Sequence, residues 1–183
     1  DDFQAHGFNA VRQAREAGMC VAGATAVEVY DTQSQEELKI TIEELHKRFE
    51  GDNHAEPLNV IGRHDKFVDS RFGKRYFVKC DSGWVPVIAA HKTKKYQEYI
   101  VVTSTGRRIR VADEHIFFNQ YGKEVFAQCL VAGDSLTTQD GVEVVTEVWK
   151  TGEMNHMFDL QVKSDKQRYY TNGFLSHNTT VVA

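Results

Sequence analysis

The stretch that decides how this chain is interpreted is Tyr169-Tyr170-Thr171-Asn172-Gly173-Phe174-Leu175-Ser176-His177-Asn178-Thr179. A β-type run leads into a glycine turn, after which His177, Asn178 and Thr179 follow in immediate succession. The side-chain amide of an asparagine can attack its own backbone carbonyl, which forms a succinimide and cleaves the chain after the asparagine. A neighbouring histidine can supply or take the proton, and a threonine hydroxyl can accept an acyl group. These three residues carry the parts for cutting and rejoining one peptide bond.

Size and charge limit the class of protein. The 183 residues are 41% hydrophobic and 26% charged, with a formal net charge of -4, which is ordinary for a globular chain of one domain or two small ones. This charge gives no pull towards nucleic acid or anionic membranes. No apolar run approaches the ~20 residues of a membrane span, and the N-terminus lacks a signal pattern. We expect a monomer in the cytoplasm of the host cell, with no nucleic-acid or membrane partner.

The three cysteines, Cys20, Cys80 and Cys129, are widely spaced and form no C-x-x-C pair, so we expect neither a zinc site nor a disulfide framework. Cys80 and Cys129 are expected to be buried bystanders, although either could form a regulatory disulfide with Cys20. No ligand-like histidine spacing occurs, and we expect no metal and no cofactor. The histidines expected on the surface are His6, His46, His54, His64, His91 and His156.

The pattern along the chain predicts an all-β domain with one or two short helices. Asn9–Ala17 and Thr41–Phe49 have helical patterns, the second with a capping box of Thr41 and Glu44. Residues 51 to 65 are polar, are expected to form a loop, and are a plausible break point in a split chain. Ser104–Arg107 has a hairpin signal between two expected strands. The strands expected from alternation and turn signals are Val27–Asp31, Tyr76–Lys79, Trp84–Ile88, Tyr99–Thr103, Arg108–Val111, Val142–Trp149, Phe158–Val162 and Tyr169–Thr171.

A possible nucleophile for the upstream end is Cys20, which lies where the helical pattern gives way to the β pattern. Its thiolate can attack the carbonyl of Met19, the residue before it, through a five-membered transition state. The plainer interpretation is a buried structural cysteine, and His177-Asn178 alone could be a polar turn. Their occurrence at both borders of one β-rich segment favours chemistry.

With these residues in place, the sequence resembles an intein, a protein-splicing domain. Four ordered blocks carry the resemblance, namely Cys20 to Val27, Arg110 to Phe117 with His115 on the block histidine, Phe158 to Val162, and Tyr169 to Asn178. The segment from Cys20 to Asn178 is too short to include a homing endonuclease, so it resembles a mini-intein. The resemblance implies a horseshoe-shaped all-β fold shared with hedgehog autoprocessing domains (the Hint fold). It divides the chain into flank 1–19, splicing domain 20–178 and flank 179–183.

The resemblance also implies a role for each residue. Cys20 attacks Met19 to form a thioester while His115, with a pKa near neutrality, protonates the departing nitrogen. Thr179 then takes the acyl group, Asn178 cyclises with help from His177, and Asp159 coordinates the steps. The only partners implied are the flanking sequences, called exteins, and no metal or nucleotide is required.

Three positions depart from the family pattern. Ala24 stands where an aspartate is usual, Ala112 replaces a hydroxyl residue three before His115, and Gln167 replaces a common histidine. These departures suggest slow or conditionally gated splicing, or else an engineered, inactive precursor.

The flanks offer one clue to a host protein. Joining Met19 to Thr179 gives a segment that resembles the phosphate-binding turn of a phage terminase large-subunit ATPase, although Met19 stands where lysine is usual. Two other functions are left open. The first is a Hint domain that cleaves the chain without ligating it, and the Asn178-Thr179 pair argues against this alternative. The second is an all-β interaction module without catalytic activity.

Overall fold

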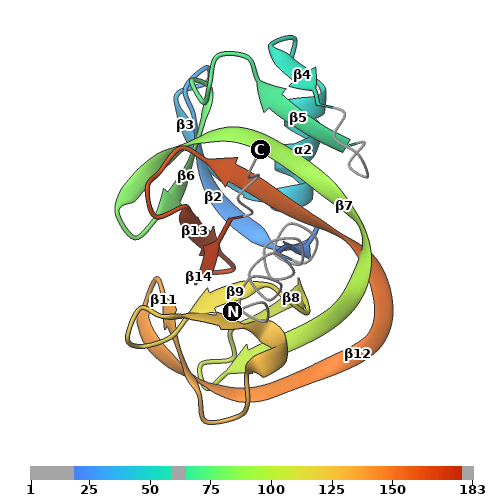
Figure 1. Ribbon diagram of the computed structural model, residues 1–183. Helices are drawn as coiled ribbons and strands as arrows, with labels where there is room; N and C mark the ends of the chain where they lie inside the picture. The colour runs from blue at the N-terminus through green and yellow to red at the C-terminus, as the bar shows by residue number, and fades with distance from the viewer. Residues whose placement is uncertain (1–18, 59–64, 179–183) are drawn as a thin grey trace, which may run out of the picture.

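The computed structural model describes residues 19–58 and 65–178, so the helix expected at Asn9–Ala17 and the expected acyl acceptor Thr179 lie outside the described residues (Figure 1). Within these ranges the chain forms one α-helix and 14 strands that are hydrogen-bonded into a single sheet. The all-β class expected from the sequence is confirmed. The first elements are β1 Val21–Ala22, β2 Ala26–Asp31, β3 Glu36–Thr41, α2 Ile42–Glu50, β4 Ala55–Pro57, β5 Asp65–Asp69 and β6 Tyr76–Cys80. The remaining elements are β7 Gly83–Thr103, β8 Arg108–Ala112, β9 Ile116–Phe118, β10 Glu124–Phe126, the 3-10 turn η1 Ala127–Cys129, β11 Ser135–Thr138, β12 Gly141–Val162, β13 Arg168–Thr171 and β14 Phe174–His177.

Two very long strands form the frame of the molecule. β7 has 21 residues and β12 has 22, and they pair antiparallel along most of their length. Their register is irregular at four places, such as the one between Lys150 and Met154, and bulges of this kind bend and twist a strand pair. The ribbon therefore curves along one side of the molecule, giving it the shape of a horseshoe (Figure 1).

The sequence prediction was wrong about these two strands, which it divided into four. Trp84–Ile88 and Tyr99–Thr103 belong to β7, while Val142–Trp149 and Phe158–Val162 belong to β12. The middle of β7, from His91 to Gln97, is rich in lysine and shows no apolar alternation. It is nevertheless extended because β12 and β5 supply backbone partners on both sides of Lys92.

The expected loop from residue 51 to 65 is also partly wrong, because Ala55–Pro57 forms β4 and pairs with β5. Asp65 is the first residue of β5. Residues 59–64 lie outside the described ranges. By contrast, the predicted hairpin around Ser104–Arg107 is confirmed as the β7–β8 connection, with Thr103 N donating to the carbonyl of Arg107 at 2.9 Å.

The predicted helix is α2, and Thr41 caps it as expected, since its hydroxyl accepts the backbone N–H of Glu44 at 3.1 Å. Its buried face packs on three strands. His46 meets Phe67 of β5 and Phe158 of β12 edge-on, both with ring centroids 5.5 Å apart, and Phe49 stacks at 5.6 Å on Tyr76 of β6. The helix thereby closes one end of the main hydrophobic core.

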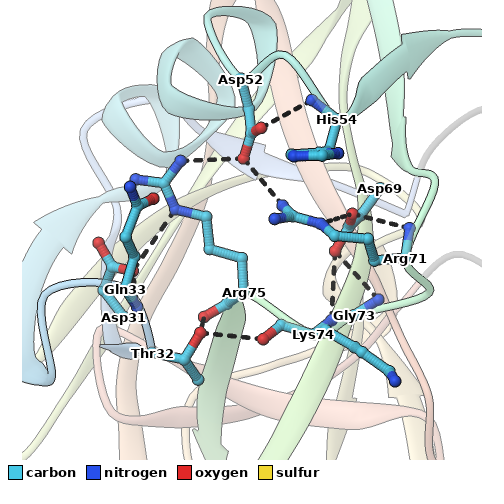
Figure 2. A network of polar contacts seen from close by, with 10 residues as sticks. All are labelled: Asp31, Thr32, Gln33, Asp52, His54, Asp69, Arg71, Gly73, Lys74 and Arg75. Carbon is cyan, nitrogen blue, oxygen red and sulfur yellow. Dashed lines mark hydrogen bonds and ion pairs between the residues drawn. The ribbon is translucent and has the colours of Figure 1, made fainter.

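A network of carboxylate and guanidinium groups connects the ends of β2, α2, β5 and β6 (Figure 2). Asp52, which follows α2, accepts hydrogen bonds from Arg71 at 3.1 Å and from Arg75 at 2.9 Å. Arg71 also pairs with Asp69 at 3.0 Å and Arg75 with Asp31 at 3.4 Å. Burial alone would raise the pKa of Asp52 and of Asp69, but hydrogen bonds and the arginine charges lower both on balance. The network ties residues before 59 to residues after 64.

Candidate functional site

Cys20 lies immediately before β1, the short strand that β8 and β12 enclose on either side. Val21 pairs with Phe158 on one side and with Val111 on the other. The cysteine is 1% exposed and packs with Ala112 and Met157 in a small apolar cluster. The sequence-predicted nucleophile is therefore held in the interior, in the centre of the sheet.

The downstream residues come from the terminal hairpin of β13 and β14. Asn172 and Gly173 form its two-residue turn and both have positive φ, 48° and 81°, which is the turn chemistry that an Asn-Gly pair favours. The turn is anchored from two sides. Ala26 N donates to Asn172 Oδ1 at 2.6 Å, and Arg107 donates to the carbonyl of Asn172 at 2.9 Å. The turn end of the hairpin is thereby fixed against β2 and against Arg107, the residue before β8.

One short segment touches both borders of the predicted domain. The backbone N–H of Ala112, at the end of β8, donates to the carbonyl of Cys20 at 3.1 Å. Five residues later, Phe117 of β9 pairs with Ser176 of β14. His115 lies between these two contacts, and its Nε2 is 2.8 Å from Ser176 Oγ. The topology thus places His115 on the segment that connects β1 with β14, two elements far apart in sequence.

The pKa of His115 differs from the sequence expectation. Burial, together with the nearby His177, lowers the pKa of His115 to about 3 instead of leaving it near neutrality. The imidazole is therefore neutral at pH 7 and must take up a proton before it can donate one. The expected pKa near neutrality is therefore wrong, because burial favours the uncharged ring.

His177 and Asn178 occupy the end of β14 and the residue after it. Asn178 is fully buried, and its N–H donates to the carbonyl of Gln167 at 2.8 Å. His177 Nδ1 lies 2.6 Å from the carbonyl oxygen of Asn178, the carbonyl that cyclisation would attack. Glu124 lies 3.7 Å from Nε2 on the other side of the ring. An imidazolium held in this way can donate to the Asn178 carbonyl oxygen and polarise it.

Asp159 is buried in β12, and its Oδ1 accepts the hydroxyl of Tyr169 at 2.7 Å. Burial and the charge of Asp159 raise the pKa of Tyr169 well above its usual value, and Cys20 adds to this shift. The phenol is therefore a neutral donor. Asp159 follows Phe158, the residue of β12 that pairs with Val21, so it lies on the strand next to the segment that begins with Cys20.

The burial of two further polar groups was not predicted, because no local signal shows that their strands pair beside Asp159. Lys66 of β5 is opposite His91 of β7, and His91 is opposite Asp159 of β12. Directly opposite residues project from the same face of a sheet. Lys66 and His91 are each 2% exposed, and Lys66 Nζ donates to Gln161 at 3.1 Å. The expectation that His91 is on the surface was wrong.

The surface expectation was also wrong for His46, which is on the buried face of α2 with Nε2 2.7 Å from the carbonyl oxygen of Asp65. His54 and His156 are exposed as expected, and His6 and His64 lie outside the described residues. Cys80 is buried as expected, with Ser82 Oγ 3.1 Å from its sulfur, whereas Cys129 is exposed. None of the three cysteines is in a disulfide.

The three departures from the family pattern occupy distinct environments. Ala24 is exposed in the turn after β1, while Ala112 is buried against Cys20. Gln167 has a positive φ of 51° and uses its backbone carbonyl to hold Asn178. Within residues 19–58 and 65–178, no cluster of three or more histidine, cysteine or acidic side chains could hold a metal ion. No helix in the same ranges is long and apolar enough to span a membrane.

The fold can be compared with solved structures. The VidaL intein (a selenomethionine variant) aligns over 89% of this chain and 99% of its own, with 19% identity and a TM-score of 0.73. The TvoVMA intein covers 87% and 98% at 17% identity with a TM-score of 0.73. A DnaB intein from Synechocystis covers 88% and 99% at 16% identity with a TM-score of 0.59. No model of a protein family and no curated protein sequence matches the chain.

These comparisons define the class of fold: the chain has the horseshoe-shaped Hint fold of the solved intein structures. The likeness extends over nearly the whole length of those structures. It is therefore a likeness to complete mini-intein-sized domains, and the fold expected from the four sequence blocks is confirmed.

Proposed function

We propose that the chain is a self-splicing domain that excises residues 20–178 and joins Met19 to Thr179. The observation that carries the proposal is the segment from Ala112 to Phe117, which is bonded to the carbonyl of Cys20 at one end and paired with Ser176 at the other. A fold that holds two chain borders around one buried histidine supplies the effective concentration that splicing needs.

The first step is an N-to-S acyl shift. The neutral imidazole of His115 accepts the proton of the Cys20 thiol, and the thiolate attacks the Met19 carbonyl carbon. The imidazolium then returns the proton to the Cys20 nitrogen as the Met19–Cys20 C–N bond breaks. The products are a thioester and a free amine, and the proton that left the thiol ends on the amine, so His115 is neutral again.

The later steps use the terminal hairpin. The hydroxyl of Thr179 attacks the thioester, which forms an ester and releases the Cys20 thiol, and Asp159 is the group we assign to the proton exchange. The side-chain nitrogen of Asn178 then attacks the Asn178 carbonyl carbon, with His177 polarising its oxygen, and the Asn178–Thr179 bond breaks. An O-to-N shift of the ester finally gives the Met19–Thr179 amide.

The same proposal assigns residues 1–19 and 179–183 to the exteins and names them as the domain's only partners. The resemblance of the joined flanks to a terminase phosphate-binding turn suggests a phage ATPase host. Insertion there would interrupt the turn until excision restores it.

The test is expression of the chain between two different carrier domains, followed by intact mass measurement. Splicing gives a joined carrier product that lacks residues 20–178 and a free excised fragment. Cys20→Ala should abolish ligation and upstream cleavage while leaving some cleavage after Asn178. Hydrolysed halves without any joined product would contradict splicing and favour the cleaving alternative.

A further inference from the structure

Two buried hydroxyl groups continue the hydrogen-bond line that starts at His115. Ser176 Oγ lies 2.8 Å from His115 Nε2, and Thr171 Oγ1 lies 2.6 Å from Ser176 Oγ. Ser176 and Thr171 are both 0% exposed, and His115 is 1% exposed. These distances are those of good hydrogen bonds, and none of the three side chains is accessible to water.

The backbone fixes this line from two directions. Thr171 and Ser176 are on neighbouring strands of the terminal hairpin, where Tyr169 is opposite Ser176 and Thr171 is opposite Phe174. Ser176 is also opposite Phe117, which packs edge-on against His115 with ring centroids 4.8 Å apart. The imidazole is thus held in one orientation, with Nε2 towards the two hydroxyl groups.

The other ring nitrogen is in a different situation. His115 Nδ1 is buried and has no hydrogen-bond partner within residues 19–58 and 65–178. A neutral imidazole carries one N–H and one lone pair, and the hydrogen bond at one nitrogen decides which nitrogen has the proton. If Nε2 carries the proton, Nδ1 has a free lone pair and can accept a proton from a neighbouring acid.

We infer that Ser176, backed by Thr171, is a positioning residue that fixes the tautomer of His115, so that Nδ1 is the base for the Cys20 thiol. Nε2–H donates to Ser176 Oγ, and the Ser176 hydroxyl donates to Thr171 Oγ1. After Nδ1 takes the thiol proton, the same Ser176 oxygen stabilises the imidazolium through Nε2–H. This inference rests on the proposed function, because it assigns the base of the first splicing step.

The assignment has a consequence for the order of the steps. Ser176 precedes His177 and Asn178 on β14. The base at the upstream junction is therefore held by the strand that carries the downstream residues. A displacement of β14 would change the hydrogen bond at Nε2, and with it the tautomer of His115.

The direct test is the tautomer of His115 in a chain made inactive by Cys20→Ala and Asn178→Ala, measured by the ¹⁵N shifts of the imidazole ring. We expect a single Nε2–H tautomer, and a mixture of tautomers in the Ser176→Ala variant. Thr171→Val, which keeps the shape and removes the hydroxyl, should move the tautomer in the same direction. Thr171→Ser is the matched control and should leave it unchanged. An Nδ1–H tautomer in the starting chain would overturn the inference.

The functional test separates the two junctions. In an Asn178→Ala, Thr179→Ala precursor, the thiol-induced cleavage before Cys20 should slow about 10-fold on Ser176→Ala, which corresponds to about 1.4 kcal/mol in the barrier. In a Cys20→Ala precursor, cleavage after Asn178 should slow much less. Equal slowing at both junctions with an unchanged tautomer would mean a merely structural role and would overturn the inference.

Failure of the proposed function would look different. The precursor with Ser176 and Thr171 intact would then show no thiol-induced cleavage at all, while the tautomer of His115 would still be measurable. If Ser176→Ala does not fold, Thr171→Val carries both measurements, and an unchanged tautomer and rate in that variant would count against the inference.

Discussion

The hydroxyl of Tyr169 donates to Oδ1 of Asp159 at 2.7 Å and accepts the backbone N–H of Leu160 at 3.2 Å, entirely inside the protein. One phenol thus satisfies a buried carboxylate and a buried amide. A buried polar group that loses its partner keeps its full desolvation cost. This contact fixes Asp159 in β12, next to Phe158, which pairs with Val21 of β1.

Tyr169→Phe should therefore destabilise the chain by about 1–3 kcal/mol, because it leaves both Asp159 Oδ1 and the Leu160 N–H without this partner. Urea unfolding of a splicing-inactive background measures the difference. Tyr170→Phe is the matched control, since the neighbouring ring is only partly buried, and it should cost less than about 0.5 kcal/mol. Equal losses in the two variants would contradict the assignment.

A close approach at Gly23 leads to a second prediction. A Cβ added there would lie 2.9 Å from Phe158 Cε1 and 3.1 Å from Glu43 Oε2. The turn after β1 has no room for it, so Gly23→Ala should cost about 1–3 kcal/mol through overpacking. It should also slow cleavage before Cys20. The added Cβ would push on Phe158, and Phe158 pairs with Val21, the residue after Cys20.

Gly51→Ala is the control for Gly23→Ala. Gly51 has φ of -86°, which any residue adopts, and an added Cβ would lie at an ordinary 3.6 Å from the Lys47 carbonyl. Its stability should change by no more than about 0.5 kcal/mol. Thermal unfolding of the two variants side by side makes the comparison, and a cost at Gly51 as large as that at Gly23 would contradict the packing argument.

The charge network in Figure 2 leads to a third prediction. Asp52 is 9% exposed and receives both Arg71 and Arg75, so Asp52→Asn should lower stability by about 1–3 kcal/mol. Asp140→Asn removes an ion pair of Arg107 from a carboxylate that is 68% exposed, and should cost under about 1 kcal/mol. Denaturant titrations at low and high salt measure both, and a larger loss at Asp140 would contradict the role given to Asp52.

The sequence predicted the elements whose local signals are strong. The Thr41 cap, the Ser104–Arg107 hairpin and the Asn172-Gly173 turn are each set by residues a few positions apart, and each is confirmed. The length of β7 and β12 was not predicted, because extension through a polar stretch such as Lys92 to Lys95 depends on partner strands that are distant in sequence. Local propensity carries no information on such pairing.

The candidate site shows the same division. Cys20, His115 and His177-Asn178 were recognised because each stands in a motif, and the structure brings the segments that carry them together. The burial of Lys66 and His91 and the contact between Ser176 and His115 were not predicted, because they depend on the register across β5, β7, β12 and β14. The pKa of His115 was mispredicted for a related reason, since burial is a property of the whole fold.

The pH dependence of stability gives the last prediction, and its sign follows from His115. An unfolded histidine has a pKa of about 6.5, whereas burial and His177 lower the pKa of folded His115 to about 3. Between these values the unfolded chain binds a proton that the folded chain refuses, so stability falls as pH falls from about 6.5 towards 3 and is fully present above that window. The slope from this one group is about 1.4 kcal/mol per pH unit.

His115→Gln in a Cys20→Ala, Asn178→Ala background should reduce the measured slope by that amount between pH 4.5 and 6, roughly midway in this window. His54→Gln, at an exposed position, should leave it unchanged. Lowered carboxylate pKa values, as at Asp52 and Asp69, act below about pH 4 and are common to all three chains. Parallel stability–pH curves for the His115 variant and its background, measured by urea unfolding, would show that the imidazole is charged in the folded state and would remove it as the neutral base of the first step.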